Sequence, residues 1–142
     1  MKYLNFTLKL LIISLFSYTL FYKIYENDVF IDTLNKSTII KDNQILYIQY
    51  FVPFSELTTI LFLLFNKKNI GFYFSFTLLL IFTFYLIALN NFSFYKGCSC
   101  GGIFNKLSYS EHLTVNILFI VISLIGILFY KNKSSINTSV IQ

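Results

Sequence analysis

Long apolar runs, separated by short polar stretches, dominate the chain up to about residue 130. A helix needs about 20 mostly apolar residues to cross a membrane. Four runs reach this length, at residues 4–22, 45–65, 70–89 and 113–130. No run alternates like the strand of a membrane barrel, and helices satisfy every backbone hydrogen bond inside lipid. The pattern therefore predicts an all-α, integral membrane four-helix bundle. We predict a single domain over residues 1–142, with a frayed tail at residues 131–142.

Composition strengthens this prediction, because 56% of the residues are hydrophobic and only 12% are charged. A soluble domain of 142 residues cannot hide that much apolar surface. The formal charge of +5 comes from lysines scattered beside the apolar runs. They form no basic stripe, so we expect no nucleic-acid partner.

Lysine placement predicts the orientation of the spans. Six lysines fall on the side of the two termini: Lys2, Lys9, Lys67, Lys68, Lys131 and Lys133. The other side carries five lysines in longer segments that are balanced by acidic residues. We expect a multi-pass protein of the bacterial inner membrane, with both termini cytoplasmic and the segment before the fourth span outside.

That outer segment holds both cysteines of the chain, Cys98 and Cys100, separated by one serine. Three glycines flank the pair and permit an unusual backbone: Gly97, Gly101 and Gly102. A disulfide across so short a ring adds little stability and is typical of exchange chemistry. Free thiols without a role, and a soft-metal site formed with His112 and Glu111, are the alternatives.

His112 is the only histidine, and it lies at the start of the fourth span, with Asn116 one helical turn further on the same face. Near a thiol, a histidine can stabilise the thiolate or shuttle a proton. A polar cap is the alternative for His112. An interhelical hydrogen bond is the alternative for Asn116.

Glu56 lies near the middle of the second span, where a carboxylate is costly unless it faces the bundle interior, is protonated or is paired. Lys23, at the outer end of the first span, is the predicted partner. Pro53 can kink the helix three residues before Glu56. A proton-moving role and a purely structural hydrogen-bond knot are equally compatible with these residues.

Taken together, these motifs make the chain similar to the MauE/DoxX-type redox-associated membrane proteins. "VPFSEL" resembles the family's Pro-x-x-Glu, here Pro53 and Glu56. "CSCGGIFNKLSYSEHLTVN" resembles its Cys-x-Cys-Gly-Gly followed by His-x-x-x-Asn. The exit of the first span resembles the family's pattern at Lys23, Phe30 and Leu34. Tyr109 departs from the pattern, because tryptophan is expected there.

The resemblance implies a four-helix membrane protein that helps to process a periplasmic partner, as in disulfide formation in the methylamine dehydrogenase light chain. We therefore predict a membrane thiol–disulfide oxidoreductase with Cys98, Cys100, His112 and Glu56 as its catalytic residues. Its partner would be a periplasmic thiol protein or a thioredoxin-like protein. A single cysteine pair needs an outside electron acceptor, and the cofactor stays unknown. A quinone among the helices near Glu56 is an open alternative that no residue pattern supports. A non-enzymatic assembly factor that docks a partner through its outer segments is the runner-up.

Overall fold

The structure is a computed structural model that describes residues 2–37, 39–65, 70–92 and 108–139. The described residues form the helices α1 (Lys2–Tyr25), α2 (Asn27–Lys36), α3 (Asp42–Phe65), α4 (Ile70–Phe92) and α5 (Tyr109–Ser139). Four of these helices are long and apolar enough to cross a membrane, over Tyr3–Tyr25, Asn43–Phe65, Ile70–Phe92 and Tyr109–Phe129. These segments contain the four predicted spans, apart from Tyr130 at the end of the fourth, and the all-α fold class is confirmed.

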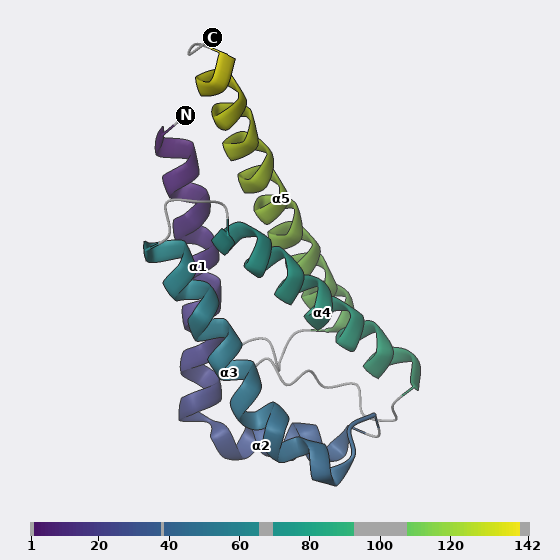
Figure 1. The fold of residues 1–142 in the computed structure, drawn as a ribbon. Coiled ribbons are helices and arrows are strands. Elements are labelled where there is room, and N and C mark those ends of the chain that lie inside the picture. The colour runs from purple at the N-terminus through teal and green to yellow at the C-terminus, as the bar shows by residue number, and fades with distance from the viewer. Residues whose placement is uncertain (1, 38, 66–69, 93–107, 140–142) are drawn as a thin grey trace.

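The four long helices run alternately up and down, so both ends of the described chain lie at the same end of the bundle (Figure 1). At the opposite end lie the C-terminal ends of α1 and α4 and the N-terminal ends of α3 and α5. This arrangement matters for the site, because it places the end of α1 close to the start of α5.

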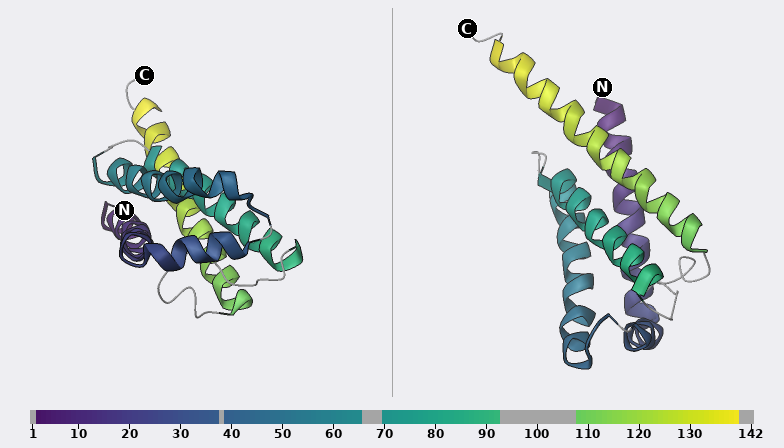
Figure 2. Two further views of the ribbon diagram at one scale, coloured as in Figure 1. Left: turned by 90° about the horizontal axis from the view of Figure 1, so that it is seen from below. Right: turned by 90° about the vertical axis from the view of Figure 1, so that its right-hand side faces the viewer.

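The short helix α2 lies across this opposite end, at a steep angle to α1 and α3 (Figure 2). It is amphipathic: Phe30, Thr33 and Leu34 are buried, while Asp28 and Asp32 are exposed. Spacings of three and four residues place the buried side chains on one helical face. Phe30 and Leu34 pack against Ile45 of α3 in a small core of their own. We did not predict this helix from the sequence.

The main core lies between α1, α3, α4 and α5. Its fully buried members include Ile12 and Phe16 of α1, Leu63 of α3 and Phe72 of α4. Many large apolar side chains on the outer faces stay exposed, as expected for helices that meet lipid rather than water.

The α4–α5 contact depends on two small residues of α5. Ser123 and Ser75 of α4 are both fully buried, and their hydroxyl oxygens lie 3.1 Å apart. A Cβ added at Gly126 would lie 2.3 Å from Cε1 of Phe72, so the absence of a side chain lets the ring pack against the α5 backbone. Small residues allow this close approach of helices in membranes.

Helix α5 continues to Ser139, and the frayed tail at residues 131–142 stays a prediction. Residues 131–139 contain neither proline nor glycine, so nothing in this stretch interrupts the backbone hydrogen bonds that propagate the helix.

Candidate functional site

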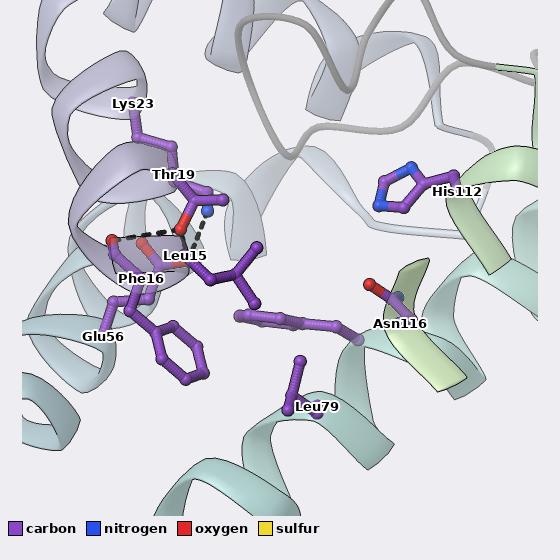
Figure 3. Close-up of a pocket in the computed structure, with 9 residues that line it drawn as sticks. Leu15, Phe16, Thr19, Lys23, Glu56, Leu79, His112 and Asn116 are labelled. Carbon is purple, nitrogen blue, oxygen red and sulfur yellow. Dashed lines mark hydrogen bonds and ion pairs between the residues drawn. The ribbon is translucent and has the colours of Figure 1, made fainter. Parts of the chain in front are cut away.

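Polar side chains from α1, α3 and α5 converge inside the bundle. Lys23, Glu56, His112 and Asn116 are all buried, with exposed fractions of 4%, 0%, 2% and 7%. Together with Thr19 of α1 they line one small cavity, and Figure 3 shows them directed toward it. We call these five residues the polar cluster. Buried polar groups in a membrane bundle are costly, which makes such a cluster a candidate functional site.

The centre of the polar cluster is an ion pair between Lys23 and Glu56. Lys23 Nζ donates to Glu56 Oε1 at 2.5 Å. This contact confirms the predicted pairing of the two residues. Lys23 also lies in the last turn of α1, where the negative end of the helix dipole favours a cation. Pairing makes the burial of both charges tolerable, because neither is left uncompensated in a medium of low dielectric constant.

Thr19 supports the same carboxylate. Its Oγ1 lies 3.2 Å from Glu56 Oε1 and 3.1 Å from the carbonyl oxygen of Phe16. The hydroxyl has one hydrogen, which it can donate to either oxygen. We missed Thr19 in the sequence, although it lies four residues before Lys23 and therefore on the same face of the helix.

Two aromatic rings flank the ammonium group of Lys23. The centroids of the Phe30 and Phe82 rings lie 5.9 and 5.5 Å from Nζ. A cation near the face of an aromatic ring is stabilised by the ring quadrupole. The helices α2 and α4 thus also contribute to holding Lys23 in place.

The position of His112 is set by the start of α5. Ser108 and Glu111 form a capping box, in which Glu111 Oε2 accepts from the backbone N–H of Ser108 at 2.9 Å and from its hydroxyl at 2.8 Å. The Ser-x-x-Glu spacing was visible in the sequence, but we read Glu111 as a possible metal ligand. In the structure its carboxylate fixes the first turn of α5, from which His112 extends into the bundle.

Asn116 faces the same cavity one turn further along α5. Within the described part of the chain, its Nδ2 has no hydrogen-bond partner. The cavity measures about 20 Å³. A site of roughly 10–15 Å³ suffices for one water molecule that has polar partners. The polar cluster therefore has room for a water between α5 and the ion pair.

Pro53 lies inside α3, one turn before Glu56. Its missing N–H leaves the carbonyl of Gln49 without the usual helical donor. The Gln49 side chain does not join the polar cluster. Its Nε2 donates to Asn27 Oδ1 of α2 at 3.3 Å, so it ties α2 to α3.

The remaining predicted site residues lie outside the described residues: Gly97, Cys98, Cys100, Gly101 and Gly102. The structure brings together Lys23, Glu56, His112 and Asn116, and the catalytic and supporting roles of all these residues stay predictions. Among the described residues, no three of His, Cys, Asp or Glu are grouped to hold a metal ion. Since both cysteines lie outside that set, the metal alternative is not tested.

Comparison with known proteins gave one family. Residues 1–129 match the family described as Methylamine utilisation protein MauE. No curated protein and no solved structure matches the chain.

Proposed function

The chain belongs to the MauE family of membrane proteins, and from this premise we propose that it exchanges disulfides with a thiol protein outside the membrane. The observation that carries the proposal is the buried polar cluster that reaches His112 in the first turn of α5. The segment with Cys98 and Cys100 immediately precedes this helix in the sequence. Titratable groups buried at such a place are typical of sites that handle protons.

The exchange step conserves electrons and protons. A thiolate of the partner attacks one sulfur of a Cys98–Cys100 disulfide and forms a mixed disulfide. The second partner thiol then resolves it. The partner leaves with a disulfide, and Cys98 and Cys100 have gained two electrons and two protons. His112 would stabilise the departing thiolate or return a proton to it.

Glu56 and Lys23 would hold α1 and α3 together within the bundle, or would carry protons away from the reacting cysteines. Asn116 would orient a water between His112 and the ion pair. Gly97, Gly101 and Gly102 would permit the backbone that a Cys-x-Cys disulfide requires. A bacterial inner-membrane location with the cysteines outside is part of the same proposal, because disulfides persist in oxidising compartments.

The first test is the redox state of the pair in intact cells, measured with a membrane-impermeant maleimide. We expect labelling only after mild reduction. Labelling without reduction would indicate free outward thiols and would contradict an exchange-ready disulfide.

The second test uses the purified protein with reduced thioredoxin as the probe thiol protein. The oxidised wild type should transfer one disulfide per chain, and Cys98→Ser or Cys100→Ser should abolish the transfer. Ser99→Ala, which keeps both cysteines, is the matched control and should retain it. Full transfer by the Cys98→Ser/Cys100→Ser protein would contradict the proposal.

A second candidate function is a non-enzymatic assembly factor, and α2 is the observation that favours it. This helix presents a polar face with Asp28, Asp32 and Asn35 exposed at the end of the bundle. Replacing these three residues by alanine would then impair maturation of a co-purifying partner, while the cysteine variants would not. The opposite pattern would exclude this candidate.

A further inference from the structure

A second cavity lies beside the polar cluster, between α2, α3 and α4. Its volume is about 290 Å³, and its walls are almost entirely apolar. Lys23 and Phe82 belong to the walls of both cavities. Ligand pockets in proteins begin at roughly 300 Å³ and combine apolar walls with a few polar groups. The cavity has the size and the lining of a site for a small apolar molecule or part of a larger one.

The few polar groups in these walls restrict the ligand. Ser55 lines the cavity, but its hydroxyl donates to the carbonyl oxygen of Val52 at 2.8 Å. The ammonium of Lys23 carries three hydrogens, of which one is directed to Glu56. Lys23 therefore supplies a charged hydrogen-bond donor to the wall, in addition to the hydroxyl of Tyr85. Its ammonium lies close to the rings of Phe30 and Phe82.

The charge state of this wall favours a neutral ligand. Glu56 neutralises Lys23, so an anionic head group would gain little from the cation and would meet the carboxylate behind it. A planar ring with a carbonyl oxygen fits better. The ring can stack on the two phenylalanines, and the oxygen can accept a hydrogen bond from Lys23.

We propose that this cavity binds the ring of a lipid-soluble quinone, with a carbonyl oxygen on Lys23 and the ring beside Phe30 and Phe82. The identity of the ligand rests on the proposed function, because oxidation of two thiols to a disulfide releases two electrons and two protons. Reduction of a quinone to a quinol takes up the same number of each. The cavity, its apolar walls and its single cation stand independently of that function.

The test measures binding of a short-chain benzoquinone to the protein in detergent micelles, by equilibrium dialysis. The Cys98→Ser/Cys100→Ser protein is used, so that no thiol chemistry interferes. We expect saturable binding. Val52→Trp and Ile81→Trp, which fill the cavity from α3 and α4, should weaken it about tenfold or more. Leu57→Trp is the matched control, since Leu57 is exposed on α3 and does not line the cavity.

Photolabelling of the wild-type protein tests the same binding site without any substitution, so it does not depend on whether the cavity-filling variants fold. An azido-benzoquinone should label the cavity walls in α2, α3 and α4. Labels spread evenly over the exposed apolar faces would overturn the proposal, as would equal binding by filled and control variants. The proposal would also be overturned if the cavity-filling variants lost bound phospholipid and quinone did not displace that phospholipid from the unfilled protein. The cavity would then hold a lipid acyl chain.

The two proposals fail separately. Quinone binding without disulfide transfer to thioredoxin would keep this inference and remove the exchange function. Transfer without saturable quinone binding would keep the exchange function and overturn this inference.

Discussion

Lys23 and Glu56 show how burial decides the strength of an ion pair. The distance from Lys23 Nζ to Glu56 Oε1 is 2.5 Å, and the distance from Lys36 Nζ to Asp32 Oδ2 on α2 is the same. The side chains of the first pair are 3% and 0% exposed, whereas those of the second pair are 53% and 56% exposed. Water screens an exposed pair, whereas a buried charge that loses its partner remains uncompensated. The two pairs therefore make a matched comparison.

We predict that Lys23→Met or Glu56→Leu alone lowers the free energy of unfolding by about 3–5 kcal/mol. The double variant should cost clearly less than the sum, because it leaves no unpaired charge. Lys36→Met should cost about 0.5 kcal/mol or less. Titration with a denaturing detergent in mixed micelles measures all four. Additive effects of the Lys23 and Glu56 substitutions would show that the pair contributes nothing as a pair.

The sequence predicted only some of the residues that surround Glu56. A carboxylate in the middle of an apolar run demands a partner, and this demand identified Lys23. Thr19 was not predicted, because a threonine in a membrane helix usually bonds to its own backbone, as Thr58 does to the carbonyl of Phe54 at 2.8 Å. Only the packing of α1 on α3 brings Thr19 to Glu56.

Among the elements, the contact of α4 with α5 depends on the missing side chain of Gly126. Phe72 is 1% exposed, so its ring has no free space into which it could move. The side chain of any other residue at position 126 would compete with it for the same volume.

We predict that Gly126→Val destabilises the protein by about 1–3 kcal/mol, through overpacking against Phe72. Combining it with Phe72→Leu, which removes the clashing ring atoms, should recover part of the loss. Leu124→Val, at an exposed position of the same helix, serves as the control. Thermal unfolding in micelles gives the order of stabilities. A Gly126→Val protein as stable as the control would contradict the close packing.

The elements also show where pattern analysis stops. Apolar runs of about 20 residues identified the four long helices, because length alone separates them from buried soluble helices. Helix α2 has ten residues and a mixed composition. Its signal was the spacing of Phe30, Thr33 and Leu34, which is too short a pattern to distinguish a helix from an irregular connection. Its contact with Ile45 of α3 stabilises it in the fold.

For the whole molecule, the alternation of four long helices places residues near both termini at one end and α2 at the other. This arrangement predicts which positions share a side of the membrane, whichever way the bundle is inserted.

We expect single cysteines introduced by Tyr3→Cys and Ser135→Cys, in the Cys98→Ser/Cys100→Ser background, to react alike with an impermeant maleimide on whole cells. Asp28→Cys, in α2, should show the opposite behaviour. A permeant maleimide should label all three and serves as the control. Opposite reactivity of positions 3 and 135 would contradict four crossings.

The buried ion pair also has an electrical consequence. Because Lys23 and Glu56 cancel each other, the voltage across the membrane exerts no net force on the pair. A proton that binds to Glu56 leaves Lys23 as a net positive charge within the bundle. Moving one charge through the full voltage corresponds to about 2.3 kcal/mol per 100 mV, and a charge at partial depth experiences a fraction of this. Any change that removes or separates one charge of this pair is therefore coupled to the membrane voltage, whereas the intact pair is not.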